Sequence, residues 1–139
     1  RQPLSVALGA ESGARDPLTG YRVLRLGLEP ERQALYARID ARAAAMFRAG
    51  LVAETEGLLR QYGPGLAALD ALGYRQAAGV LRGELTLEEA VTEAQRGHRQ
   101  YAKRQMTWFR REPEVVWLRG FGEEPGIGAA AEAAIAEAT

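Results

Sequence analysis

Residues 86–111 read TLEEAVTEAQRGHRQYAKRQMTWFRR, and this stretch decides the fold. Thr86 followed by Glu89 forms a capping box, which marks the start of a helix. No proline interrupts the sequence until Pro113, which cannot continue a helix. We therefore predict one unbroken helix from Thr86 to about Arg111.

The predicted helix has two contrasting faces. At about 100° per residue, one face carries mainly apolar side chains: Leu87, Ala90, Val91, Ala94, Tyr101, Ala102, Trp108 and Phe109. The opposite face carries Arg96, Arg99, Lys103, Thr107 and Arg110, with Gln100, Arg104 and Arg111 beside them. Because Trp108 and Phe109 lie on the apolar face, we expect them to anchor the helix in the core rather than stack on nucleic-acid bases.

Charge is concentrated on this helix, although the 139-residue chain has 18 basic and 18 acidic residues and a net charge of zero. The segment 96–111 contains no acid and six cations: Arg96, Arg99, Lys103, Arg104, Arg110 and Arg111. We expect no acid to neutralise them. Such a segment attracts phosphates. A solvated helix whose charges follow its macrodipole is also common, so spacing alone leaves both interpretations open.

The other segments predict a mainly α fold with one or two short strands. Residues 1–20 are a loop-like lead-in, residues 21–28 alternate between apolar and polar as a strand does, and residues 114–118 look like a short strand. Pro30 suits the first turn of a helix over 31–49, which Gly50 ends in the left-handed conformation. Further helical segments are expected over 51–62, from about Leu66, up to about Gly83, and over 127–139. A lone strand is marginal, so residues 21–28 should join a sheet that this chain does not complete. The division expected is 1–20, 21–120 and 121–139.

Arg42 occupies an unusual position in the helix 31–49. Leu35, Ile39 and Met46 define the apolar stripe of this helix, and Arg42 falls inside it, with Arg38 at its edge. The simpler interpretation, which periodicity favours, is that Arg42 reaches solvent or pairs with Asp40 or Asp70. The alternative is an arginine at the wall of a cleft that holds an anion, because burying it unpaired costs too much.

Several classes of site find no support in the sequence. The chain has no cysteine, which excludes disulfides and thiolate metal sites, and no apolar run is long enough to span a membrane. His98 is the only histidine, and without a Ser or Cys nucleophile pattern it is interpreted as structural. No metal-ligand spacing and no glycine-rich phosphate loop is present. We assign no catalytic residue and no metal ligand.

Three stretches, taken together, resemble the tRNA dimethylallyltransferases. The first is Tyr21–Phe47, with Gly27-Leu28-Glu29-Pro30 and Leu35-Tyr36-Ala37-Arg38-Ile39. The second is Ala71-Leu72-Gly73-Tyr74-Arg75-Gln76. The third and most specific is Arg99-Gln100-Tyr101-Ala102-Lys103-Arg104-Gln105-Met106-Thr107-Trp108-Phe109-Arg110, followed by Val116-Trp117-Leu118. The resemblance covers about residues 1–120.

The resemblance implies an enzyme that moves a dimethylallyl group from dimethylallyl diphosphate to N6 of the adenosine 3′-adjacent to the anticodon. It implies that this chain is the C-terminal portion of a P-loop-kinase-like α/β fold, cytoplasmic and monomeric when complete, without a membrane partner. Arg42 would bind the diphosphate. The tRNA anticodon stem-loop would contact Asp70, Ala71, Leu72, Gly73, Tyr74 and Arg75, and also Lys103, Arg104, Gln105, Met106, Thr107, Trp108, Phe109 and Arg110.

The resemblance also implies that essential parts lie upstream of this chain. In the family, a Walker-like loop holds the diphosphate with Mg²⁺, and an aspartate acts on the adenine amino group. The chain begins at Arg1 without an initiator methionine, so we interpret it as a fragment that is catalytically incomplete. A non-enzymatic RNA-binding helical module and a helical protein–protein adaptor are the alternatives.

Overall fold

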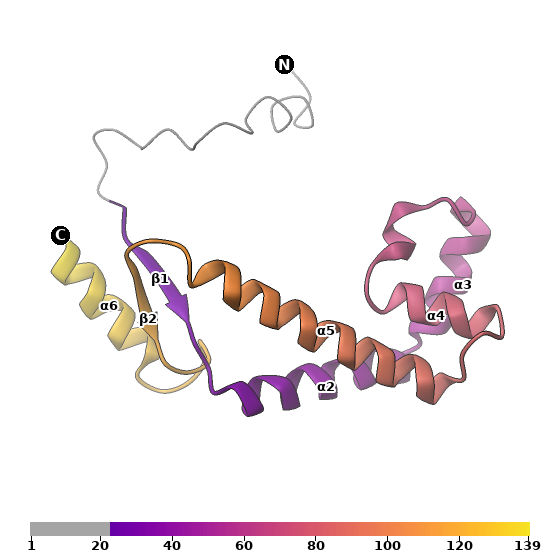
Figure 1. Cartoon of the computed structure of the whole chain (residues 1–139), viewed down its shortest axis with the longest axis horizontal. Coiled ribbons are helices and arrows are strands. Elements are labelled where there is room, and N and C mark those ends of the chain that lie inside the picture. Colours follow the sequence, from indigo (N-terminus) through magenta and orange to yellow (C-terminus); the bar gives the residue numbers. More distant parts are fainter. Residues whose placement is uncertain (1–22) are drawn as a thin grey trace, which may run out of the picture.

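The computed structural model describes residues 23–139, so the predicted lead-in 1–20 lies outside the described residues. The elements are β1 (Arg25–Leu28), α2 (Arg32–Arg48), α3 (Leu51–Tyr62), the 3₁₀ helix η1 (Ala67–Asp70), α4 (Tyr74–Leu81), α5 (Leu87–Phe109), β2 (Val115–Leu118) and α6 (Ile127–Ala138). The prediction of a mainly helical chain with two short strands is confirmed (Figure 1).

Helix α5 begins where its capping box predicts. The Thr86 hydroxyl accepts a hydrogen bond from the Glu89 N–H at 3.2 Å, and the Glu89 carboxylate accepts one from the Thr86 N–H at 2.8 Å. These two backbone hydrogen-bond donors would otherwise be unsatisfied at the helix start. The helix ends at Phe109, with Arg110 as its C-cap, slightly before the predicted end at Arg111.

Helix α2 is capped by Glu31 rather than started by Pro30. The Glu31 carboxylate accepts hydrogen bonds from the N–H groups of Gln33 at 2.9 Å and Ala34 at 2.7 Å. These two hydrogen bonds lower the pKa of Glu31, because they stabilise its charged form. Pro30 therefore precedes the cap, and its predicted place in the first turn is wrong. Gly50, with φ +104°, separates α2 from α3 as predicted.

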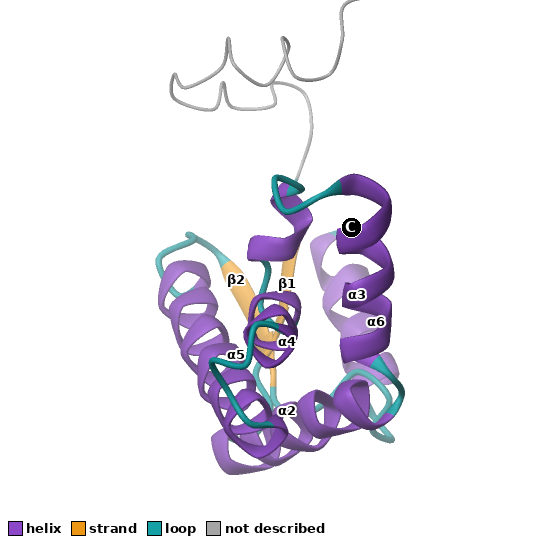
Figure 2. Ribbon diagram, turned by 90° about the vertical axis from the view of Figure 1, so that its right-hand side faces the viewer, coloured by secondary structure: helices purple, strands orange, loops and turns teal. Residues whose placement is uncertain are grey.

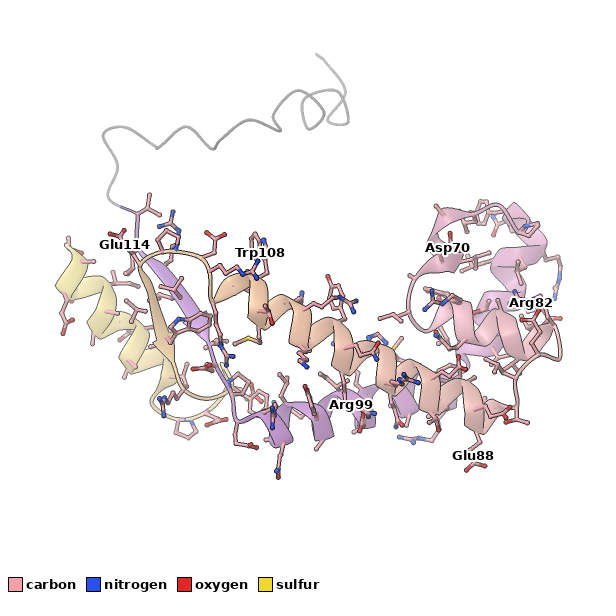
Figure 3. The ribbon with its side chains drawn as sticks, viewed as in Figure 1. Asp70, Arg82, Glu88, Arg99, Trp108 and Glu114 are labelled. Atoms are coloured by element: carbon pink, nitrogen blue, oxygen red, sulfur yellow. The ribbon has the colours of Figure 1, made fainter. Side chains whose placement is uncertain are left out.

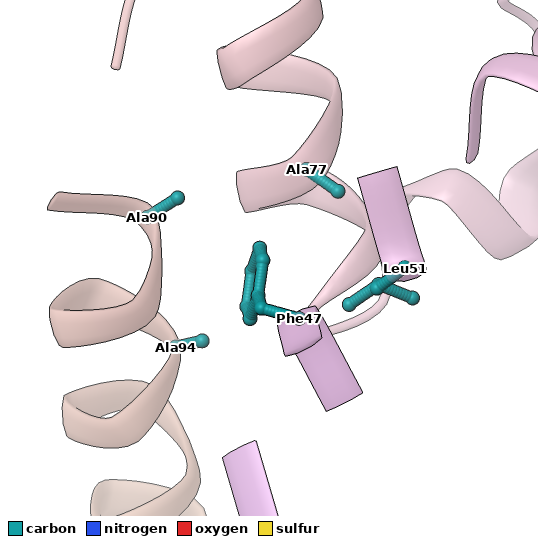
Figure 4. Packing of buried hydrophobic residues seen from close by; sticks show 5 residues of the cluster. All are labelled: Phe47, Leu51, Ala77, Ala90 and Ala94. Atoms are coloured by element: carbon teal, nitrogen blue, oxygen red, sulfur yellow. The ribbon is translucent and has the colours of Figure 1, made fainter. Parts of the chain in front are cut away.

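The core lies where α2, α3, α4 and α5 meet. Phe47 and Leu51 pack against three alanines, Ala77 on α4 and Ala90 and Ala94 on α5 (Figure 4). Alanines at these positions let α4 and α5 approach the Phe47 ring closely. The adjoining Thr55 is fully buried, and its hydroxyl donates to the Leu51 carbonyl at 2.7 Å, so no polar group is left unpaired there.

The two strands pair with each other in parallel, with Arg25 opposite Val115 and Leu28 opposite Leu118. The strand β1 therefore has a partner within this chain, contrary to the expectation that it joins a sheet that this chain does not complete. Parallel strands require a long crossover, and here α2 to α5 lie between them in the sequence. Two further bonds extend the pairing, from the Glu29 N–H to the Leu118 carbonyl at 2.8 Å and from the Gly120 N–H to the Glu29 carbonyl at 3.3 Å.

The arrangement places the strand pair at one end of the molecule and α3 and α4 at the other. Helices α2 and α5 pack together near α4 and diverge toward the strands, and α6 packs beside β2 (Figure 1). Figure 2 views the molecule from the α3–α4 end, with the strands behind the helices.

Replacement of Phe47 by alanine should destabilise the chain strongly. Phe47 is 7% exposed, and the side chains of the neighbouring alanines are too short to fill the cavity that loss of the ring would leave. We expect the free energy of unfolding to fall by about 3–5 kcal/mol, measured by urea denaturation. The control is Tyr62→Ala, because Tyr62 is 58% exposed on α3 and should change stability by less than about 0.5 kcal/mol. Equal effects of the two variants would contradict the assignment of this core.

Candidate nucleic-acid interface and anion cleft

A cleft of about 1220 Å³ opens between α2, α5 and the strand pair. Its walls are mainly apolar, and its charged and polar lining includes Arg38, Arg42, His98 and Glu112. The cleft exists because α2 and α5 diverge after their contact near α4. It lies at the far end of α5 from the core cluster.

Arg42 lies on the wall of this cleft and is exposed. Neither of its two predicted partners pairs with it within residues 23–139, because Asp40 pairs with Arg99 instead and Asp70 forms no ion pair there. His98 lines the same cleft, and burial lowers its pKa, as does the positive charge of Arg42. The His98 Nε2 atom is buried without a hydrogen-bond partner in the described part of the chain. Arg42 therefore lies on the wall of a cleft and also reaches solvent, as the simpler interpretation expected, whereas the pairing with Asp40 or Asp70 is wrong.

Arg38, one helical turn before Arg42, lines the same cleft. Its guanidinium forms an ion pair with Glu123 and lies 3.6 Å from the centre of the Phe121 ring. The Glu123 carboxylate has its pKa lowered mainly by this hydrogen bond from Arg38. This contact could not be predicted from the sequence, because nothing in the periodicity of α2 indicates that the segment after β2 returns to it.

A polar clamp joins α2 to α5. Arg99 donates to the Asp40 carboxylate, and the Gln95 side-chain amide donates to the Asp40 carbonyl at 3.0 Å. In Figure 3, Arg99 lies between the two helices. Arg99 was placed on the predicted phosphate-facing surface, and this part of the prediction is wrong, because its charge is directed toward α2.

Lys103 and Arg104 of α5, together with Arg111 just beyond its end, line a basic hollow. It has a volume of about 430 Å³ and is lined by Gln100, Lys103, Arg104, Thr107, Trp108 and Arg111. Lys103, Arg104 and Arg111 form no ion pair with any residue that the structure describes. Arg110 does pair, at 2.6 Å from a carboxylate oxygen of Glu29. The expectation that no acid neutralises this segment therefore fails at Arg99 and Arg110.

The aromatic residues near the end of α5 are exposed, which corrects the prediction that they anchor the helix in the core. Trp108 is 50% exposed and Phe109 is 44% exposed, and their rings meet edge to face at 4.9 Å. Tyr101 is 50% exposed on the same helix. The physical reason is that the core ends near Ala94, and beyond it the apolar face of α5 borders the cleft.

The second predicted contact segment, residues 70–75, packs against α5. Leu72 lies over Gly97, where an added Cβ would come within 2.6 Å of a Leu72 methyl carbon. Gly73, with φ +96°, caps α4, and the Tyr74 hydroxyl donates to the Glu54 carboxylate at 2.6 Å. Asp70, Ala71 and Arg75 remain exposed. Asp70 and Trp108 lie on the same side of α5 in Figure 3, opposite α2.

The contact segment 103–110 is exposed along α5 except at Met106, which is half-buried and lines the cleft, as does Gln105. Thr107 donates its hydroxyl to the Lys103 carbonyl at 2.9 Å, within the helix itself. The segment 70–75 therefore packs against the middle of α5, and the segment 103–110 forms the C-terminal end of the same helix.

Neither a metal cluster nor a membrane-spanning helix is found in the described chain. Within residues 23–139, no three His, Cys, Asp or Glu side chains come together as a possible metal site. No helix there is both long and apolar enough to cross a membrane.

The described chain is a helical module with a parallel strand pair and a basic hollow beside α5. Residues 2–112 match the family described as IPP transferases. The chain is 65% identical over 113 residues to the tRNA dimethylallyltransferase of Koribacter versatilis, and 55% identical over 117 residues to that of Solibacter usitatus. The chain belongs to the IPP transferase family.

Solved structures agree with this assignment. The full-length tRNA isopentenylpyrophosphate transferase of Bacillus halodurans is similar over 87% of this chain, with a TM-score of 0.74 and 34% identity. The corresponding transferase of Staphylococcus epidermidis also has a TM-score of 0.74, with 31% identity over 86% of this chain. The matches cover 81% of this chain for each of the two named relatives but only 37% of each relative, and 42% of the Bacillus structure.

Replacement of Arg42 by glutamine should raise the pKa of His98, because it removes the positive charge that disfavours the imidazolium while leaving the burial in place. The pKa should still remain below the ordinary histidine value. A pH titration by NMR measures this directly, since His98 is the only histidine. The matched control is Arg82→Gln, because Arg82 pairs with Glu84 and does not line the cleft. An unchanged pKa in the Arg42 variant would contradict the proximity of the two side chains.

Proposed function

We propose that this chain is the helical, RNA-contacting C-terminal part of an enzyme that transfers a dimethylallyl group from dimethylallyl diphosphate to N6 of the adenosine 3′-adjacent to the anticodon in tRNA. The observation that carries the proposal is the family match over residues 2–112, together with relatives named tRNA dimethylallyltransferase. The complete enzyme would have a P-loop-kinase-like fold, act as a monomer in the cytoplasm, and use residues 21–120 of this chain as its helical C-terminal region.

Arg42 is the residue that we assign to the diphosphate. Its support is geometric: it lies on the wall of the cleft, and it forms no ion pair within the described residues. In the reaction, the bond from N6 to the dimethylallyl carbon forms as the bond from that carbon to the diphosphate oxygen breaks, and N6 loses a proton. A guanidinium can bind two phosphate oxygens at once and stabilise the negative charge that develops on the diphosphate.

The remaining chemistry is not assigned to this chain. The resemblance to the family implies Mg²⁺ beside the diphosphate, but no three His, Cys, Asp or Glu side chains in residues 23–139 come together to hold a metal ion. The base that accepts the N6 proton and the glycine-rich loop are likewise assigned to a part of the enzyme upstream of residue 1.

The tRNA is assigned to α5 and the segment attached to its middle. Lys103 and Arg104 are exposed and line the basic hollow, and the exposed residues Asp70 and Arg75 belong to the second segment. Phosphate contacts by Lys103 and Arg104 would fix the position of the RNA and make its affinity depend strongly on salt. Arg110 can contact the RNA only if its guanidinium leaves Glu29 and binds a phosphate instead.

The purified 139-residue chain should bind an anticodon stem-loop but should not transfer a dimethylallyl group. The reason is that no side chain of this chain is assigned as the base or as a metal ligand. The assay incubates the chain with tRNA and labelled dimethylallyl diphosphate, with a full-length family enzyme as the positive control. Measurable turnover by the chain would contradict the assignment of the catalytic groups to another part of the enzyme. RNA binding by the chain and no activity in any longer form of the protein would favour the non-enzymatic RNA-binding module.

The double variant Lys103→Ala plus Arg104→Ala should weaken stem-loop binding and lower its salt dependence. Each lost phosphate contact reduces the slope of log affinity against log salt by slightly less than one, so the double variant should lose about one to two. Fluorescence anisotropy at several salt concentrations measures both quantities. The control Arg82→Ala removes a cation that pairs with Glu84 away from the hollow and should leave the slope unchanged. A protein–protein adaptor would show no stem-loop binding to lose.

A further inference from the structure

Two large aromatic side chains form an exposed edge along α5, which we call the aromatic edge. It consists of Tyr101 and Trp108, each 50% exposed. They are seven residues apart, which corresponds to about two helical turns, or roughly 10 Å along the axis. Both therefore project from nearly the same side of the helix. Figure 3 shows Trp108 projecting away from α2.

The aromatic edge separates two surfaces of opposite character. Trp108 lines both the apolar cleft and the basic hollow, while Tyr101 lines the cleft. Arg104, which lines the hollow, lies over the Tyr101 ring at 5.8 Å from its centre. The cations of the hollow are therefore next to the aromatic rings.

The combination selects a partner by its chemistry. Rings that are half-exposed leave apolar area in contact with water, and a flat apolar ligand that stacks on them removes that area. The adjacent cations Lys103, Arg104 and Arg111 favour a ligand that carries negative charge beside its flat group. Unpaired RNA meets both requirements, because its bases offer flat faces and its backbone offers phosphates. In a fully paired duplex the base faces are already stacked on one another.

We propose that Tyr101 and Trp108 are stacking platforms for unpaired RNA bases, with Trp108 as the main platform, while Lys103, Arg104 and Arg111 hold the phosphates beside them. This rests on the proposed function, since it names the form of RNA that the same surface recognises. The aromatic edge would then make the chain bind a loop more tightly than a duplex, and the cations would supply the affinity common to both forms of RNA.

The test compares two probes, an anticodon stem-loop and a fully paired RNA duplex with the same number of phosphates. Binding of the chain to each is measured at several salt concentrations. Trp108→Ala should lower affinity for the stem-loop by about 5- to 100-fold with little change in salt slope, because stacking involves no counterion release. Its affinity for the duplex should remain unchanged, and Tyr101→Ala should act in the same way but more weakly. Trp108→Phe should retain most of the affinity, because it keeps a ring for stacking.

The controls separate this proposal from the proposed function. Tyr62→Ala removes an aromatic residue that is 58% exposed on α3 and should leave both affinities unchanged. Lys103→Ala plus Arg104→Ala should weaken binding to both probes. If that double variant weakens both probes while Trp108→Ala affects neither, stacking on Trp108 is overturned and the RNA-binding function stands. If the intact chain binds neither probe, the proposed function itself fails. Circular dichroism and melting temperature verify that Trp108→Ala is folded, and a matching loss of duplex binding by that variant would also overturn the proposal.

Discussion

The packing of α2 against α5 is the contact on which the rest of the structure depends. Near α4, Phe47 of α2 meets Ala90 and Ala94 of α5 in the buried core. Further along, the Asp40 carboxylate receives the Arg99 guanidinium. The apolar contact supplies most of the stabilisation, because the Asp40 and Arg99 side chains are 34% and 32% exposed and pairs so accessible to water contribute little. The ion pair instead fixes how α2 faces α5.

The strand pair lies at the other end of the molecule and forms one wall of the cleft. Strand β1 leads into α2 and strand β2 follows α5, so their parallel register sets where the outer ends of both helices lie. The helices are in contact near α4 and diverge toward the strand pair (Figure 1). Side chains at the diverging ends, including Leu35 and Phe109, therefore line open space. The cleft therefore lies between the helices and the strand pair, which are joined directly in the sequence.

Local signals allowed the helices to be predicted from the sequence, whereas the site depended on contacts that periodicity does not contain. Thr86 with Glu89 and Gly50 marked the helix boundaries correctly, because capping involves residues close in sequence. Periodicity also placed Trp108 and Phe109 on the apolar face, but it cannot tell whether that face meets a core or a cleft. The pairing of Arg110 with Glu29, far apart in the sequence, was inaccessible for the same reason. The diphosphate role proposed for Arg42 rests on the family resemblance, and its place on the cleft wall is what the structure adds.

The arginines of the cleft and of α5 differ in how strongly their present partners hold them. Arg38 and Glu123 are 54% and 63% exposed, and Arg110 is 61% exposed beside Glu29 at 29%. Pairs in water contribute about 0–1 kcal/mol, and a phosphate that accepts two hydrogen bonds from one guanidinium competes well with a single carboxylate. Arg99 is more buried and also belongs to the clamp between α2 and α5. Arg38 and Arg110 can therefore leave their carboxylates and bind an anion without disturbing the packing of α2 against α5. Arg99 cannot, because its ion pair with Asp40 is part of that packing.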